Sequence, residues 1–305
     1  MTEAAIGSAP SGPSARDGFR LAGVFSVLPT AFHEDGRLDP DGIRALVRAH
    51  VDAGVAGLTV LGVMGEAAEL SESERTDVLA IVRAAADTVP IVLGVSGPTV
   101  EIVAARSRDA GAGGASAVMV SPAKSLQLRD AVGAAAAGGL PIVIQDYPAG
   151  SRVHLARAEL VDAAAHPLVA GVKAEAPPTA SAIAALRRLR PDLDAMGGLG
   201  GLFLVDELRA GATGSMTGFA MPERLVAIVR TFAADRAAAT AAWTALLPLM
   251  RFEAFQPASL AARKEVWRLR GVIRSAYCRR EGAALDDVAR ADVRRALEAV
   301  TTAAD

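Results

Sequence analysis

Eight short apolar segments recur along this chain of 305 residues, each followed by a turn and a stretch with helical periodicity. Near-continuous apolar strands that alternate with helices are typical of a parallel sheet covered on both faces. Eight such units within about 250 residues match the count and size of a TIM (β/α)8 barrel. The segments lie at residues 23–28, 57–62, 90–94, 117–120, 141–145, 168–173, 193–197 and 213–217.

The main structural alternative is an open doubly wound sheet, which more often has five or six strands and a glycine-rich nucleotide-binding turn. Neither feature is found in this sequence. After Met221-Pro222-Glu223 the strand pattern ends, and alanine-rich helical sequence continues to the C-terminus. We therefore expect an α/β fold in which a (β/α)8 barrel over residues 21–236 is followed by a small helical domain over residues 237–305.

Local signals support the expected helices between the strands. Asp39 can cap a helix that has Pro40 at its first position, and Ser71 with Glu74 forms a capping box. By contrast, residues 1–20 are rich in Ala, Ser, Gly and Pro and lack the basic start and apolar stretch of a signal peptide. Their composition predicts a disordered tail.

Composition excludes several classes of partner. The net charge of −2 gives no general attraction to nucleic acid, and the apolar stretches are too short to span a membrane. A single cysteine, Cys278, forbids an intrachain disulfide and fits a reducing cytoplasm. The four histidines lack the spacing of metal ligands. We expect a cytoplasmic protein that uses no metal and no cofactor.

Lys173 ends the sixth apolar segment, and Glu175 follows two residues later. Burial disfavours the charged form of an amine and makes a lysine a usable nucleophile toward a ketone. The alternative is a lysine that extends from a strand end into solvent. Active sites of such barrels lie at the C-terminal ends of the strands, which favours the first interpretation. Glu175 should lie on the same face as Lys173 if the strand continues.

Other polar or small residues follow the same strand ends. A lysine beside a carboxylate, a phenol and an amide suggests imine chemistry on a small oxo acid. The glycine-rich turn at 197–201 is weaker evidence, because a tight turn needs glycines as readily as a ligand does. The candidates at these strand ends are Val63, Met64, Glu66, Lys124, Gln145, Asp146, Tyr147 and Gly198.

The chain resembles the dihydrodipicolinate synthase / N-acetylneuraminate lyase superfamily of class I aldolases from about Gly23 to Val300. Four landmarks occur in the family's order and spacing. They are Leu28–Phe32, Gly62–Glu66 with the following Leu70-Ser71 and Glu74-Arg75, Gly171–Lys173, and Gly211–Gly214. The resemblance implies that Lys173 forms a Schiff base with pyruvate or a related 2-oxo acid. It also implies a homodimer or homotetramer.

Departures from the family pattern concern the proton relay. Gln145 stands where the family has its catalytic tyrosine, and an amide cannot exchange a proton as a phenol can. Val63 and Met64 replace a pair of threonines, although the backbone N–H groups of that loop could still hold a carboxylate. Lys124 falls in the segment that normally carries a tyrosine into the neighbouring subunit. These changes identify a divergent member.

The sequence therefore predicts a Schiff-base lyase, either aldolase or dehydratase, that acts on a 2-oxo acid. Two alternatives remain: a true 4-hydroxy-tetrahydrodipicolinate synthase with a rebuilt relay, and a non-catalytic barrel that binds a 2-oxo acid. We expect Lys173, Tyr147 and Glu175 to be catalytic. The expected substrate-binding residues are Val63, Met64, Gln145, Lys124 and Gly198.

Overall fold

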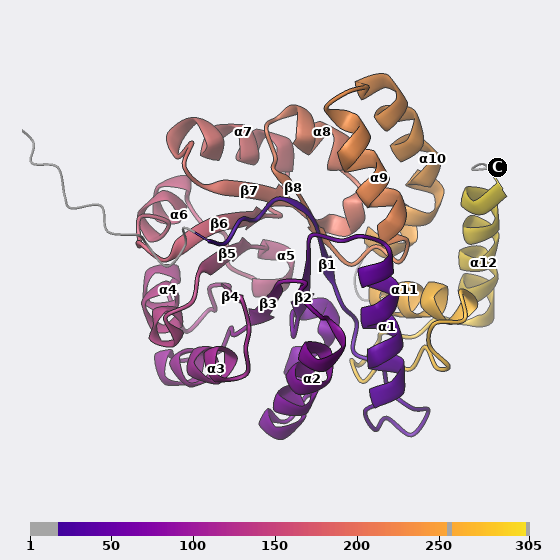
Figure 1. The fold of residues 1–305 in the computed structure, drawn as a ribbon, viewed down its shortest axis with the longest axis horizontal. Helices are drawn as coiled ribbons and strands as arrows, with labels where there is room; N and C mark the ends of the chain where they lie inside the picture. Colours follow the sequence, from indigo (N-terminus) through magenta and orange to yellow (C-terminus); the bar gives the residue numbers. More distant parts are fainter. Residues whose placement is uncertain (1–17, 255–257, 303–305) are drawn as a thin grey trace, which may run out of the picture.

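A closed barrel of eight parallel strands forms the centre of the molecule (Figure 1). The computed structural model describes residues 18–254 and 258–302. Each strand pairs with the next along the chain, and β8 pairs with β1 to close the barrel. The predicted TIM barrel is thereby confirmed. Its strands are β1 (Gly23–Val27), β2 (Gly57–Val60), β3 (Ile91–Gly94), β4 (Ala117–Val120), β5 (Ile142–Asp146), β6 (Val169–Ala174), β7 (Asp194–Gly197) and β8 (Gly214–Thr217).

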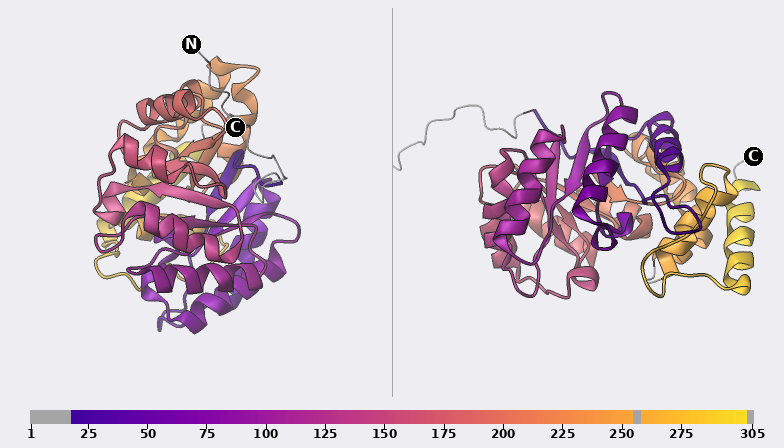
Figure 2. Two further views of the ribbon diagram at one scale, coloured as in Figure 1. Left: turned by 90° about the vertical axis from the view of Figure 1, so that its left-hand side faces the viewer. Right: turned by 90° about the horizontal axis from the view of Figure 1, so that it is seen from below.

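Helices surround the barrel, and short helical turns follow several strands (Figures 1 and 2). The α-helices of the barrel are α1 (Pro40–Asp52), α2 (Glu72–Ala85), α3 (Val100–Ala112), α4 (Leu128–Ala135), α5 (Pro148–Ser151), α6 (Arg157–Ala163), α7 (Thr179–Leu189), α8 (Leu204–Arg209) and α9 (Pro222–Phe232). The 3-10 turns are η1 (Val63–Gly65), η2 (Ala67–Glu69), η3 (Ala136–Gly138) and η4 (Leu199–Gly201).

The predicted helix starts are observed. The side chain of Asp39 accepts a hydrogen bond from the Gly42 N–H at 3.0 Å at the start of α1. Ser71 and Glu74 form a reciprocal capping box at the start of α2. These caps satisfy N–H groups that a helix leaves unpaired at its first turn, so the chain enters each helix at a defined point.

The apolar core has two parts, because successive strand side chains point to opposite faces of the sheet. One part fills the inside of the barrel, and the other packs the strands against the helices. Close packing inside the barrel depends on Gly57, where a Cβ atom would lie 2.2 Å from the ring of Phe25. The inner part includes Phe19, Leu21, Phe25, Val92, Met119, Val143, Met196 and Met216.

Three helices follow the barrel: α10 (Arg236–Ala254), α11 (Ala258–Leu269) and α12 (Asp287–Thr302). They pack on one another, and α10 also packs against α9. Figures 1 and 2 show α11 and α12 as a lobe on one side of the barrel. The predicted boundary between residues 236 and 237 lies in the first turn of α10, and the division into two domains stays a prediction.

The predicted disordered tail lies mostly outside the described residues, since the description begins at Gly18. Phe19 is buried and stacks edge-on against Phe25 at 6.0 Å. Arg20 forms an ion pair with Asp194 at 2.9 Å. Phe19 and Arg20 therefore contact the barrel, although the predicted tail includes them. None of the helices described here is long and apolar enough to cross a membrane.

Candidate active site

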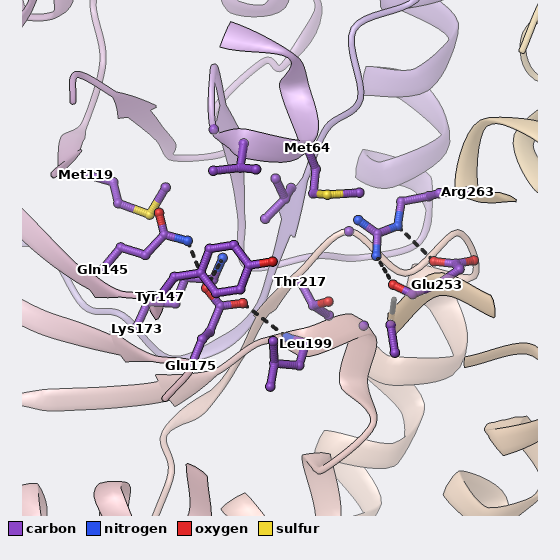
Figure 3. A pocket seen from close by; sticks show the side chains of 16 residues that line it. Met64, Met119, Gln145, Tyr147, Lys173, Glu175, Leu199, Thr217, Glu253 and Arg263 are labelled. Atoms are coloured by element: carbon purple, nitrogen blue, oxygen red, sulfur yellow. Dashed lines mark hydrogen bonds and ion pairs between the residues drawn. The ribbon is translucent and has the colours of Figure 1, made fainter. Parts of the chain in front are cut away.

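Lys173 extends from the carboxyl end of β6 into a pocket at the mouth of the barrel (Figure 3). Its residue exposure is only 6%. In the sheet register Lys173 lies opposite Gln145 of β5 and Met196 of β7. The structure therefore agrees with the first interpretation, in which Lys173 is buried, and not with the alternative, in which its side chain extends into solvent.

Glu175 lies on the same side as Lys173, with Oε2 only 2.9 Å from the lysine Nζ. The same oxygen accepts a hydrogen bond from Nε2 of Gln145 at 2.8 Å, and Oε1 accepts one from the Leu199 N–H at 3.1 Å. Gly198 leaves room for this arrangement, because a Cβ atom there would lie 2.1 Å from Oε1. Gly198 therefore packs against the carboxylate of Glu175. It is not among the residues that line the pocket, where the sequence had placed it as a substrate-binding residue.

Gln145 orients the carboxylate of Glu175. Its amide oxygen accepts a hydrogen bond from the Ser121 hydroxyl at 3.1 Å while its amide nitrogen donates to Glu175. Each end of the amide thus has a partner of the matching kind. The glutamine that departs from the family pattern cannot transfer a proton, but it holds the carboxylate beside Lys173.

Tyr147 lines the pocket together with Gln145, as alternation along the chain predicts. It is 9% exposed, and it lines the same pocket as Lys173 and Glu175 (Figure 3). Gly150, in the short helix α5, packs under this ring: a Cβ atom at Gly150 would lie 2.5 Å from two ring carbons. The residue at position 150 therefore controls where the tyrosine lies.

Asp146 points to the opposite face of β5, into a separate cavity beside Leu155 and Pro177. Burial raises the pKa of its carboxyl, and the charge of Glu175 raises it further. Asp146 can influence Glu175 through charge, but it does not line the pocket around Lys173.

Val63 and Met64 line the pocket from η1, the turn after β2. Thr30 fixes this turn by donating its hydroxyl hydrogen to the carbonyl oxygen of Gly65 at 2.6 Å. Within the turn the N–H of Gly65 donates to the oxygen of Gly62, and the N–H of Glu66 donates to that of Val63. The loop therefore presents apolar side chains to the pocket.

Glu66 is fully buried beneath this loop and faces away from the pocket. It pairs with Lys264 of α11 at 2.5 Å and accepts a hydrogen bond from the Arg280 N–H at 2.8 Å. Lys264 also donates to the Tyr277 carbonyl at 2.8 Å, and burial lowers the pKa of its amine. This pair joins the loop after β2 to the C-terminal helices.

Lys124 lies outside the pocket, in contrast to its expected role. It is exposed at the tip of a tight turn after β4, which is closed by two hydrogen bonds between Ala123 and Leu126. Lys124 is not among the residues that line the pocket. Following a strand in sequence was not sufficient to bring this side chain to the site.

Three lining residues with polar side chains were not anticipated: Thr217, Glu253 and Arg263. Thr217 ends β8 and could have been found by the same rule as the other strand ends. Glu253 and Arg263 belong to α10 and α11, and they form a buried ion pair at 2.9 Å. No local signal in those alanine-rich helices indicates that they reach the barrel mouth.

A second, wider cavity adjoins the pocket and shares Gly62, Val63, Met119, Gln145 and Tyr147 with it. Four arginines are among its lining residues: Arg75, Arg106, Arg152 and Arg280. This arrangement leaves space beyond Tyr147 for the part of a ligand that does not react. Among the described residues, no group of three or more His, Cys, Asp or Glu side chains could hold a metal ion.

The model of the dihydrodipicolinate synthetase family matches residues 20–300 of the chain. The chain belongs to that family. It is 33% identical to L-2-keto-3-deoxyarabonate dehydratase of Azospirillum brasilense, over 84% of this chain and 87% of that enzyme. It is 34% identical to 4-hydroxy-tetrahydrodipicolinate synthase of Sorangium cellulosum, over 75% of this chain and 80% of that enzyme.

Solved structures of the dihydrodipicolinate synthetase family agree with the fold. Dihydrodipicolinate synthase from Rhodopseudomonas palustris is 32% identical and superposes with a TM-score of 0.87, covering 94% of this chain and 98% of the other. The family assignment confirms the predicted resemblance. This family member is an enzyme, a lyase of the class I aldolase type.

Proposed function

We propose that Lys173 is the residue that forms the Schiff base with the ketone carbon of pyruvate or a related 2-oxo acid. The observation that carries this proposal is the position of its amine, buried at the end of β6 and 2.9 Å from a carboxylate oxygen of Glu175. A nucleophilic amine needs a neighbour that can take its proton. Glu175 is within hydrogen-bond distance for that transfer.

In this reaction the neutral amine of Lys173 attacks C2, and the ketone oxygen leaves as water after proton transfer. The resulting iminium carbon withdraws electrons from C3. Loss of a C3 proton gives an enamine, which can expel a hydroxide from C4 as water. Alternatively, loss of the C4 hydroxyl proton breaks the bond between C3 and C4. Both routes need one lysine and a nearby acid–base group, so the site suits a dehydratase or an aldolase.

We assign proton transfer to Glu175 and Tyr147, since both line the pocket beside Lys173. The alternative role for Glu175 is that of an ion-pair partner for Lys173. In that role the carboxylate would stabilise the charged form of the amine and oppose its nucleophilicity. Gln145 would position Glu175 through the hydrogen bonds described above. Val63 and Met64 would form an apolar wall of the site. Gly198 would contribute indirectly, because the absence of a side chain at this position leaves room for the carboxylate of Glu175.

The proposed substrate is a 2-oxo acid other than the precursor of dihydrodipicolinate. Gln145 replaces the relay tyrosine, and the dehydratase similarity covers most of the chain. The alternative, a true synthase with a rebuilt relay, draws support from the similarity to the Sorangium enzyme. Condensation of pyruvate with aspartate semialdehyde would separate the two, because the proposal expects this reaction to be very slow.

Borohydride trapping tests the assignment of Lys173. Incubation with pyruvate and borohydride should add a reduced pyruvyl group to the peptide that contains Lys173. Lys173→Arg should abolish the adduct while keeping a cation beside Glu175. Labelling that persists in this variant would show that another amine reacts, and an unlabelled wild-type protein with every 2-oxo acid tested would contradict the proposed imine.

We also propose a homodimer or homotetramer in the cytoplasm, as the family resemblance and the single Cys278 suggest. Light scattering at micromolar concentration measures the assembly directly. A purely monomeric protein would contradict it.

A further inference from the structure

A second carboxyl group lies behind the one that contacts Lys173. Glu207 of α8 is completely buried, and its carboxyl packs against Gly197 at the end of β7. A Cβ atom at Gly197 would lie 1.9 Å from the carboxyl carbon of Glu207, so a side chain at position 197 would displace it. Neither oxygen of Glu207 has a hydrogen-bond partner among the described residues. Imine chemistry at Lys173 does not by itself require this group.

Glu207 and Glu175 lie against neighbouring glycines of one segment. The carboxyl of Glu207 packs on Gly197, and Oε1 of Glu175 lies 2.1 Å from the position that a Cβ atom of Gly198 would take. Consecutive α-carbons are about 3.8 Å apart, so the two carboxyl groups lie within about 11 Å of each other. The Leu199 N–H donates to the same oxygen of Glu175 and holds that carboxylate against the turn (Figure 3).

The two carboxyl groups are separated by buried backbone. Glu207 is 0% exposed and Glu175 is 5% exposed, and Gly197 and Gly198 are buried as well. Buried charges act on each other with less screening by water and salt than charges at the surface. A charge on Glu207 would therefore act on Glu175 and on the amine of Lys173, which lies 2.9 Å from Oε2 of Glu175.

The surroundings of Glu207 favour its neutral form, because burial without a compensating partner disfavours a carboxylate. Its pKa is raised to about 8, chiefly by burial. The hydroxyl of Thr179 in α7, although not in hydrogen-bonding geometry, lowers this pKa, and the negative charges of Glu175 and Asp206 raise it. Among the described residues, the other elements that pack on α8 (α9, α10, β7 and β8) add no charge that acts on this group.

A charge on Glu207 would oppose the loss of a proton from Lys173. The amine can attack a ketone only in its neutral form. A negative charge behind Glu175 stabilises the protonated form of the Lys173–Glu175 pair, so it raises the pH at which the amine becomes neutral. A neutral Glu207 has no such effect.

We propose that Glu207 sets the proton affinity of the Lys173–Glu175 pair from behind the turn between β7 and η4. As a neutral acid it leaves Lys173 free to lose its proton, and as a carboxylate it holds the pair in the protonated form. Glu207 does not line the pocket. It acts through Glu175, so it is a positioning residue and not a catalytic one. This inference rests on the proposed imine at Lys173.

The test measures the rate of imine formation with pyruvate from about pH 6 to about pH 10 in the wild-type protein and in Glu207→Gln. Samples are quenched at intervals with borohydride at one fixed pH, so that reduction takes place under the same conditions throughout. Below about pH 7 the two rates should agree within about twofold, because Glu207 is neutral there. The midpoint of the rise in rate with pH should lie about 0.5 to 1 pH unit lower in Glu207→Gln than in the wild-type protein.

Two further variants separate the charge of Glu207 from its packing. Glu207→Met is also neutral and of similar length, and it should lower the midpoint as Glu207→Gln does. Asp206→Asn removes a charge from the same helix, but Asp206 is half exposed and pairs with Arg209 at 3.2 Å. Its midpoint should stay that of the wild-type protein, because solvent screens an exposed charge. Urea denaturation checks that each variant is folded.

Coincident pH profiles for the wild-type protein and both Glu207 variants would overturn the proposal. An equal shift in Asp206→Asn would overturn it too, since the effect would then belong to the net charge of α8. A shift in Glu207→Met alone would assign the effect to lost packing, with the same consequence. Failure of the imine chemistry is a separate result, because the wild-type protein would then form no adduct at any pH.

Discussion

The amine of Lys173 and the carboxylate of Glu175 share a single close contact, 2.9 Å from Nζ to Oε2, at the mouth of the barrel. Both side chains are buried, and the carboxylate of Glu175 also accepts hydrogen bonds from Gln145 and from the Leu199 N–H. The carboxylate is therefore held in one position relative to the amine. A group that must take a proton from the lysine and return it later benefits from such a fixed position.

Glu175→Gln should separate imine formation from turnover. A glutamine has one acceptor oxygen in place of two, so it can accept a hydrogen bond on the side of Lys173 or from the Leu199 N–H but not on both sides, and it cannot carry a proton. We expect the pyruvate adduct still to be trapped, although more slowly because the amine has lost the carboxylate that takes its proton, with kcat lower by about 10²–10⁴-fold on the true substrate. A screen of 2-oxo acids followed by steady-state kinetics measures this. Near-normal turnover would leave Glu175 with a purely structural role.

Gly150→Ala should impair catalysis by moving Tyr147. The added methyl group would lie 2.5 Å from the tyrosine ring, so the ring must shift. We expect turnover to fall as it does in Tyr147→Phe, while trapping at Lys173 persists in both variants. Gly133→Ala is the matched control, because nothing lies within 4 Å of a Cβ atom there. Normal turnover in Gly150→Ala together with a loss in Tyr147→Phe would mean that the ring tolerates displacement.

Lys264→Met should destabilise the fold, because it leaves the buried carboxylate of Glu66 without its cation. Breaking a buried ion pair typically costs about 3–5 kcal/mol. Urea denaturation should show this loss. The double variant Glu66→Gln/Lys264→Met removes both charges and should recover much of the stability. An equally large loss in the double variant would assign the effect to packing rather than to the unpaired charge.

Glu207→Gln should change how stability depends on pH. Glu207 of α8 is fully buried against Gly197, and burial raises the pKa of its carboxyl to about 8. In the native state the carboxyl of Glu207 therefore keeps a proton. In the unfolded chain the same carboxyl loses this proton once the pH exceeds its ordinary pKa of 4.5. The stability from this group is complete below pH 4.5 and is lost as pH rises through 8.

The wild-type protein should accordingly lose stability relative to Glu207→Gln as pH rises from 4.5 to about 8, by up to a few kcal/mol. Urea denaturation at several pH values measures the difference, and other titrating groups cancel in the comparison. Parallel pH profiles for the two proteins would show that Glu207 is ionised in the native state at neutral pH.

Much of the barrel was predictable because its signals are local. Each strand is a short apolar run, and each following helix has its own start signal, such as Asp39 or Ser71. Closure of eight parallel strands then brings their carboxyl ends together. For that reason Lys173 and Gln145 could be placed at one site from their positions in the sequence alone.

The sequence by itself determined the fold, the lysine and the side of the sheet on which its neighbours lie, because alternation along a strand is a property of the backbone. Only the tertiary structure decided which other side chains reach the pocket. Lys124 follows a strand but is exposed outside the pocket, whereas Arg263 and Glu253 line the pocket from helices beyond the repeat. A helical pattern shows which face of a helix is apolar, but where that helix docks depends on contacts between distant parts of the chain.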